Sequence, residues 1–173
     1  MVSFIRQQSK KIRMKKYIFL VVLLAAVGFV NAQEKAELTT KQLLETKNFI
    51  FKAETVTAQR GRFRQLTSEY DVVVTNDTVI AFLPFFGRAY SAPINPSEGG
   101  IKFTSGKFGY SLEHGKKKRW TLKIKPEDVK EVQDMYFTIF DNKKATLLVN
   151  SLNRESIVFN GYIIEGKDQK KAF

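Results

Sequence analysis

Most of the chain after residue 48 alternates apolar and polar side chains, and this period of two residues constrains the fold more than any other feature. The alternation is clearest over residues 49–54, 70–75, 108–113 and 120–125. Successive side chains of a β-strand point to opposite faces of a sheet, so each run predicts a strand with one buried face. We therefore expect a mainly β fold.

Short connections indicate how these strands pair. Residues 76–77 are Asn-Asp, which tolerate the positive φ of a tight hairpin, and residues 115–118 form a basic turn between two alternating runs. Further strands are expected at residues 78–83, 101–104, 132–140, 145–150 and 156–164. Parallel strands need long crossovers, which this chain lacks. The prediction is an antiparallel meander of about eight strands that forms a barrel or a two-sheet sandwich.

One helix is expected ahead of the first strand, over residues 37–47. Leu38, Leu43 and Leu44 fall on one side of it, and Thr39 or Thr40 can cap its start. The predicted organisation is a signal peptide over residues 1–32, a helical segment over 33–47, an antiparallel β domain over 48–165 and a flexible polar tail over 166–173.

The first 32 residues have the pattern of a secretory signal peptide. Six basic residues and no acidic one precede or adjoin an apolar run over residues 17–30, which is shorter than the ~20 residues of a membrane-spanning helix. Small side chains close the run, so we expect cleavage between Ala32 and Gln33. An uncleaved anchor fits the basic cluster less well. Met14 opens a tighter signal peptide by itself, so translation starts at Met1 or at Met14.

Cleavage of the predicted signal peptide lowers the net charge of the chain. The whole chain carries +12, and loss of the six basic residues in the leader leaves +6 on 141 residues (173 minus 32). Much of the basicity is therefore targeting signal, and we expect no nucleic-acid partner. The expected location is the periplasm or the cell exterior, with the membrane met only through the transient signal peptide.

The residue inventory excludes many kinds of active site. The chain has no cysteine, which excludes disulfides and thiolate chemistry, and its single histidine, His114, lies beside a turn where we expect it to be exposed. We expect no metal site and no cofactor. A glycosidase needs only two facing carboxylates, but no pair of acidic residues stands out on an inward face. We therefore expect the chain not to be an enzyme.

The segment after residue 83 carries the first candidates for ligand contact, because Pro84 ends a strand and the chain leaves the sheet there. Aromatic rings and one guanidinium come together at Phe85, Phe86, Arg88 and Tyr90. Rings offer flat apolar area and an arginine orients a carboxylate, phosphate or sugar hydroxyl, which predicts a binding mouth. In the structural alternative, the two phenylalanines close one end of a barrel and Arg88 pairs with an acid or caps strand carbonyls.

A basic run in a hairpin turn is the second candidate, for an anionic partner such as a lipid headgroup or an acidic glycan. It consists of Lys116, Lys117, Lys118 and Arg119. Ordinary solvation of a turn accounts for the same charges. A further basic stripe at Arg60, Arg62 and Arg64 is interpreted as a charged strand edge that resists aggregation.

Several runs carry a resemblance to a known family. They are residues 70–74 (YDVVV), 77–79 (DTV), 83–90 (LPFFGRAY), 99–103 (GGIKF), 145–157 (ATLLVNSLNRESI) and 160–161 (NG). Together they resemble the domain-of-unknown-function family DUF4251, over roughly residues 49–164. The resemblance implies one exported β-rich domain of a Gram-negative bacterium, with no activity and no site residues to transfer.

The sequence therefore predicts a non-catalytic binding module of the cell envelope, whose partner is a small apolar molecule, a glycan or an envelope protein. The alternative is a structural or protein-interaction domain of the envelope without a ligand cavity. A binder should have an open pocket lined by aromatic residues and one or two polar groups. A scaffold should have a filled interior and an exposed apolar patch.

Overall fold

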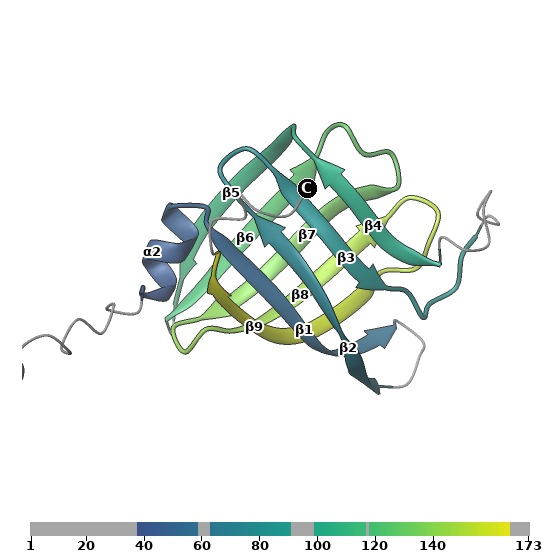
Figure 1. Cartoon of the computed structure of the whole chain (residues 1–173), viewed down its shortest axis with the longest axis horizontal. Helices are drawn as coiled ribbons and strands as arrows, with labels where there is room; N and C mark the ends of the chain where they lie inside the picture. Colours follow the sequence, from purple (N-terminus) through teal and green to yellow (C-terminus); the bar gives the residue numbers. More distant parts are fainter. Residues whose placement is uncertain (1–37, 59–62, 91–98, 117, 167–173) are drawn as a thin grey trace, which may run out of the picture. The chain divides into compact units, whose positions relative to one another are not determined.

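The computed structural model describes residues 38–58, 63–90, 99–116 and 118–166, which form nine strands and one short helix (Figure 1). The strands are β1 (Phe49–Ala58), β2 (Phe63–Val74), β3 (Val79–Pro84), β4 (Gly100–Ser105), β5 (Phe108–Gly115), β6 (Arg119–Pro126), β7 (Val132–Phe140), β8 (Lys144–Ser151) and β9 (Ile157–Glu165). The mainly β prediction is confirmed. The predicted leader, and the predicted tail beyond Gly166, lie outside the described ranges and stay predictions.

The strands form a single sheet that curls into a nearly closed barrel. Its order is β4-β3-β2-β1-β9-β8-β7-β6-β5, and every neighbouring pair is antiparallel. Eight successive reversals leave the two outer strands, β4 and β5, running in the same direction. Only Gly106 and Lys107 separate them, so they are two halves of one bent strand. The first half pairs with β3 and the second with β6, which makes the fold a barrel rather than a two-sheet sandwich.

The interior of the barrel is filled with side chains. Phe49, Phe51, Phe137 and Phe159 point inward and have no solvent exposure. The Phe137 ring lies edge-on to the rings of Phe49 and Phe51, with centroids 6.2 and 5.7 Å away. Such T-shaped contacts are favourable because the positive edge of one ring meets the negative face of another. Among the described residues, the barrel therefore has a packed core, as small eight-stranded barrels can, and not an open lipocalin-like interior.

The helix, α2 (Thr40–Glu45), is shorter than the predicted span of residues 37–47. Of the two predicted caps, Thr39 is the one used: it forms a capping box with Gln42, so the helix begins at Thr40 and not at residue 37. Its end is set by Lys47, whose φ of 47° is left-handed, and by the amide of Asn48, which donates to the carbonyl of Leu43 at 3.2 Å. This arrangement is a Schellman motif, which stops a helix even without glycine. Within the described ranges, no helix is long and apolar enough to cross a bilayer.

The helix covers one end of the barrel beside β5 (Figure 1). Leu43 and Leu44 have no solvent exposure. The hydroxyl of Tyr110 on β5 donates to the carbonyl of Leu44 at 2.7 Å, and burial raises the pKa of Tyr110 far above its ordinary value. The helix is therefore part of the core, and it fixes the end of the barrel opposite the predicted binding mouth.

Asp128 stabilises the bend between β4 and β5. Its carboxylate accepts a hydrogen bond from the hydroxyl of Ser105 and two more from the amides of Gly106 and Lys107, at 2.9 and 3.2 Å. The hydrogen bond from Ser105 is the main cause that holds the pKa of Asp128 below its ordinary value. One acidic side chain in the β6–β7 connection thus fixes the link on which closure of the barrel depends.

We expect Asp128→Asn to unfold at a lower urea concentration than the wild-type chain near neutral pH, because an amide replaces a carboxylate that accepts three hydrogen bonds. A carboxyl group with a lowered folded pKa contributes stability above its unfolded pKa of about 4, and this contribution is lost as the pH falls through the folded value. The gap between the urea midpoints of variant and wild type should therefore narrow as the pH falls below about 4. Glu113→Gln, on the exposed side of β5, is the control and should follow the wild-type profile. A gap that stays constant down to acid pH would contradict this role for Asp128.

Candidate functional site

The predicted binding mouth lies at the end of the barrel opposite α2, and its four residues have different environments. Phe85 is half-buried, packs against the core and lies under the guanidinium of Arg154, whose Cζ is 5.2 Å from the ring centroid. Phe86 is 44% exposed, with the Cζ of Arg64 4.9 Å from its ring centroid. Phe85 therefore closes one end of the barrel, whereas Phe86 remains on the surface.

Arg88 and Tyr90 belong to a segment held by its backbone. The amide of Glu155 donates to the carbonyl of Arg88 at 3.0 Å, and the amide of Arg88 donates to the buried carboxylate of Glu155 at 3.3 Å. The amide of Tyr90 donates to the carbonyl of Asn153 at 2.8 Å. The side chains of Arg88 and Tyr90 are both exposed. Glu155 thus binds the main chain of Arg88, and the predicted partners of the guanidinium stay a prediction.

The predicted basic run lies in the turn between β5 and β6. Lys116, Lys118 and Arg119 are exposed, and Lys118 has a left-handed φ of 55°, whereas Lys117 lies outside the described residues. His114 is exposed, as expected, with its ring centroid 4.4 Å from that of Trp120. Of the basic stripe, Arg60 and Arg62 are also outside the described ranges, and Arg64 is exposed on β2.

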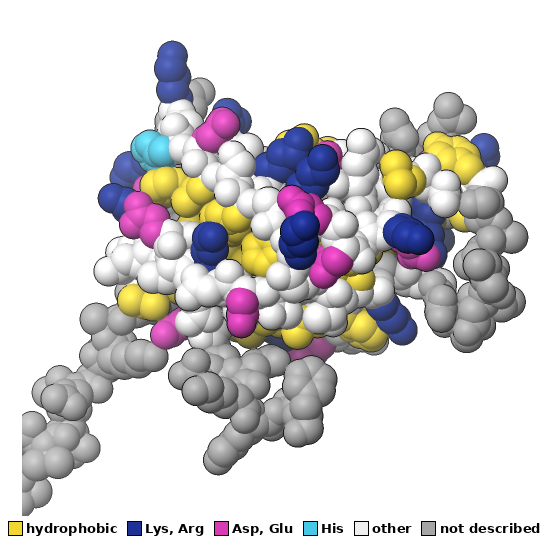
Figure 2. Space-filling view, turned by 90° about the horizontal axis from the view of Figure 1, so that it is seen from above, with side chains coloured by type: hydrophobic (Ala, Val, Ile, Leu, Met, Phe, Trp, Pro, Cys, Tyr) yellow, Lys and Arg dark blue, Asp and Glu magenta, His cyan; other side chains and the backbone are white. Residues whose placement is uncertain are grey.

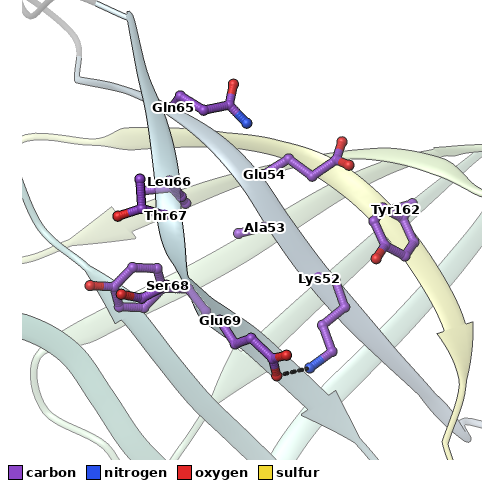
Figure 3. A pocket seen from close by; sticks show the side chains of 10 residues that line it. Lys52, Ala53, Glu54, Gln65, Leu66, Thr67, Ser68, Glu69 and Tyr162 are labelled. Atoms are coloured by element: carbon purple, nitrogen blue, oxygen red, sulfur yellow. Dashed lines mark hydrogen bonds and ion pairs between the residues drawn. The ribbon is translucent and has the colours of Figure 1, made fainter.

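A different feature, a break in the pairing of β1 with β2, forms a hollow on the solvent side of the sheet. Ala53 pairs with Tyr70 and Thr55 pairs with Gln65, so one residue of β1 stands opposite four residues of β2. β1 also carries a bulge at the same position relative to β9. A hollow of about 250 Å³ lies at this break, and Leu66, one of the extra residues of β2, still packs against the core (Figure 3). We name this hollow the β1–β2 hollow; it is lined by Lys52, Ala53, Glu54, Gln65, Leu66, Thr67, Ser68, Glu69, Tyr70 and Tyr162.

Polar and charged groups dominate the rim of the β1–β2 hollow. The ammonium of Lys52 lies 2.9 Å from a carboxylate oxygen of Asp71 and 3.4 Å from one of Glu69. The hydrogen bond to Asp71 is the main cause that raises the pKa of Lys52. Glu54 and Tyr162 lie on the other side of Ala53 from Leu66 and Thr67 (Figure 3). The hollow therefore combines an oriented cation, carboxylates, hydroxyl groups and an exposed ring.

An aromatic pair extends the hollow along the outer surface. Tyr70, which lines the hollow, stacks on Phe82 of β3, with ring centroids 5.6 Å apart and an interplanar angle of 24°. None of the four residues of the predicted binding mouth lines the hollow. In the part of the chain that the structure describes, no group of three or more histidine or acidic side chains is placed to hold a metal ion.

Comparison with known proteins gives a family and a fold. A family model described as "Domain of unknown function (DUF4251)" matches residues 31–163. Among solved structures, the crystal structure of a DUF4251 family protein from Bacteroides eggerthii DSM 20697 is similar, with a TM-score of 0.55 and 16% identity over 72% of this chain and 84% of that one. The comparison with curated proteins found no match. The structural likeness therefore supports a shared fold, without an activity to transfer.

Proposed function

Because the chain belongs to the DUF4251 family, whose function is unknown, we propose from its own structure that it is a non-catalytic binding module of the cell envelope that holds a glycan in the β1–β2 hollow. The observation that carries this proposal is the hollow itself, which the pairing break builds from strands at the centre of the sheet. A hollow at this place is preorganised, because the flanking residues of β1 and β2 remain hydrogen-bonded in the sheet.

The size and lining of the hollow favour a sugar over an apolar ligand. Sites for drug-sized molecules are mostly apolar and typically measure about 300–1,000 Å³, so a hollow of about 250 Å³ suits a single sugar ring better. Its hydroxyl, amide and charged groups can bond sugar hydroxyls, and the ring of Tyr162 offers a flat apolar face. The packed interior leaves no described alternative for an apolar guest, since the large inward side chains are fully buried.

Two carboxylates line the hollow, which raises the question of glycoside hydrolysis. A hydrolase needs one carboxyl group that stays protonated, and enzymes achieve this by desolvation in an apolar pocket. The side chain of Glu69 is 91% exposed and pairs with Lys52, and Glu54 is exposed as well. These surroundings suit carboxylates that accept hydrogen bonds from a bound sugar, and they support binding without turnover.

Export and location belong to the same proposal. The basic cluster followed by a short apolar run supports secretion, to the periplasm or the cell exterior, where glycans are abundant. A structural or interaction domain without a ligand would share the packed interior. The β1–β2 hollow is the feature that favours a ligand-binding role over that alternative.

We expect neutral oligosaccharides to bind at the hollow, and titration of a set of malto-, cello-, manno- and chito-oligosaccharides followed by amide NMR spectroscopy tests this. At least one should shift the signals of residues 52–54 and 65–69. Tyr162→Ser should weaken binding of that sugar roughly fivefold, because it removes an aromatic contact worth about 1 kcal/mol. Tyr136→Ser is the matched control, since Tyr136 is a half-buried tyrosine of β7 with a lysine over its ring and does not line the hollow.

Each component of the proposal has an outcome that would overturn it. If none of the four sugar series shifts the signals of the hollow, glycan binding there is wrong. If Tyr136→Ser weakens the sugar as much as Tyr162→Ser does, the site lies elsewhere. If the NMR spectrum shows cleavage products that disappear in Glu54→Gln or Glu69→Gln, the chain is a glycosidase and not a binding module.

A further inference from the structure

Exposed large hydrophobic side chains gather at the end of the barrel opposite α2. Among the described large hydrophobic side chains that are exposed, the four most exposed are Tyr90 (71%), Phe63 (62%), Leu152 (61%) and Phe86 (44%). We name this set the aromatic end. It lies apart from the β1–β2 hollow, because none of the four lines it.

The strand registers place these four residues at the same end. Phe63 pairs with Thr57, which pairs with Val158 near the start of β9. Phe86 lies two residues beyond the end of β3, and Leu152 comes directly after the end of β8. Tyr90 lies beside Leu152, because its amide donates to the carbonyl of Asn153. Seen from above, hydrophobic side chains lie beside basic ones toward the end of the molecule away from α2 (Figure 2). Three segments that are distant in the sequence therefore converge on one surface.

The framework under this surface is fixed. Arg154 donates to the carbonyl of Gly100 at 2.9 Å, lies 3.7 Å from the carboxylate of Glu131, and pairs with Ala89 in a β-bridge. Together with the backbone hydrogen bonds of Arg88 and Tyr90, these contacts join the segment after β3 to the β8–β9 connection. The exposed side chains of Phe86, Tyr90 and Leu152 thus project from segments whose backbones are held together by these contacts.

Basic residues flank the four exposed side chains in the sequence, and two acidic residues lie close by in space: Glu155 is buried against the amide of Arg88, and Glu131 lies 3.7 Å from Arg154. Among described residues within two positions of the four exposed side chains, the charged ones are Arg64, Arg88 and Arg154, and none is acidic. Arg154 is mostly buried and occupied by its framework contacts. Arg64 and Arg88 are exposed, and the guanidinium of Arg64 lies over the ring of Phe86. Aromatic rings flanked by arginines are typical of surfaces that enter the headgroup region of a membrane.

We infer that the aromatic end docks on an anionic lipid surface, with its apolar side chains in the interfacial layer and with Arg64 and Arg88 at lipid phosphates. Lipid is favoured over a protein partner because the four side chains project outward from separate segments. A fluid bilayer accepts such projections without a complementary shape. The exposed guanidinium groups of Arg64 and Arg88 favour anionic headgroups. This role extends the sequence-based expectation, in which only the signal peptide meets a membrane.

Cosedimentation with vesicles tests the inference, using the purified full chain with its N-terminus determined by mass spectrometry. The wild type should bind phosphatidylglycerol vesicles at least roughly tenfold more tightly than phosphatidylcholine vesicles, and less tightly in about 0.5 M NaCl. Phe86→Ser combined with Tyr90→Ser should weaken binding roughly tenfold or more. Phe140→Ser is the matched control, because Phe140 has a similar exposure of 42% but lies at the α2 end. Arg88→Glu should weaken binding to phosphatidylglycerol vesicles and leave binding to phosphatidylcholine vesicles unchanged.

Several results would overturn the inference. The wild type could fail to bind vesicles, or it could bind both lipids equally. Phe140→Ser could also lose as much vesicle binding as the double variant. Displacement by excess soluble glycerol phosphate would show a site for a free anion and not for a surface. If vesicles do not bind and an envelope protein protects Phe63 and Tyr90 from labelling, the surface belongs to a protein partner. The double variant should keep any sugar binding at the β1–β2 hollow, which separates failure of this inference from failure of the proposed function.

Discussion

Gly161→Ala should destabilise the barrel more than any other single methyl group added to a described glycine. A Cβ at Gly161 would overlap the carbonyl oxygen of Lys52 and lie 2.9 Å from its carbon and 3.2 Å from the Cα of Ala53. These are backbone atoms of β1, which stays paired with both β9 and β2, so they cannot move aside separately. We expect a loss of about 3 kcal/mol in the free energy of unfolding. Urea unfolding followed by circular dichroism measures it.

The matched control is Gly109→Ala, also a glycine within a strand. Its added Cβ would come no closer than 3.9 Å to any atom, at the Cβ of Lys125. Alanine lowers the conformational entropy of the unfolded chain, so this variant should be neutral or more stable by up to about 1 kcal/mol. Similar losses in the two variants would show that close approach of β1 to Gly161 is not what requires glycine there.

The bend of β1 connects this glycine to the proposed site. β1 has an extra residue between Ala53 and Thr55 relative to β9, where Gly161 and Asn160 are consecutive. The bulge lies where the backbone of β1 comes close to Gly161 and where the pairing of β1 with β2 is interrupted. Gly161 therefore permits the distortion of β1 at which the β1–β2 hollow forms. In the folded fraction of Gly161→Ala, we also expect altered NMR signals for residues 65–69.

Strand positions could be predicted from the sequence because alternation is a local property. The hairpin at Asn76 and Asp77 is confirmed by the pairing of Val74 with Val79, although neither residue has the positive φ on which the prediction is based. The hairpin after Gly115 is confirmed by the pairing of Gly115 with Arg119. The bend at Gly106 and Lys107 could not be predicted in the same way. It depends on Asp128, more than twenty residues later, and no local pattern shows where a carboxylate will lie.

The β1–β2 hollow left only a weak signal in the sequence. Residues 65–69, Gln-Leu-Thr-Ser-Glu, interrupt the alternation, but such an interruption is also typical of an ordinary loop. That these residues belong to one strand, β2, becomes clear only from the pairing of Gln65 with Thr55. The aromatic run after β3 shows the opposite case. Its composition was visible, yet whether a ring is half-buried, as for Phe85, or exposed, as for Phe86, depends on packing with distant parts of the chain. Phe85 packs against the core, and the two rings lie under Arg154 and Arg64, which come from other strands and connections.

Phe137→Ala should unfold far more easily than the wild-type chain, with a loss of about 4 kcal/mol in the free energy of unfolding. Phe137 has no solvent exposure, and its ring makes edge-to-face contacts with Phe49 and Phe51 from the opposite side of the barrel. Truncation removes the burial of the ring and leaves a cavity that strands held by hydrogen bonds on both edges cannot close.

Phe140→Ala is the control on the same strand, because Phe140 is 42% exposed and its removal should cost about 1 kcal/mol or less. Thermal unfolding of both variants beside the wild type measures the difference. Were the two losses similar, the interior would be loose enough to collapse around the missing ring. A loose interior would be able to admit an apolar ligand, and the choice of a sugar over an apolar ligand would lose the support of the packed core. The result for Phe137 therefore tests the core and the choice of ligand class together.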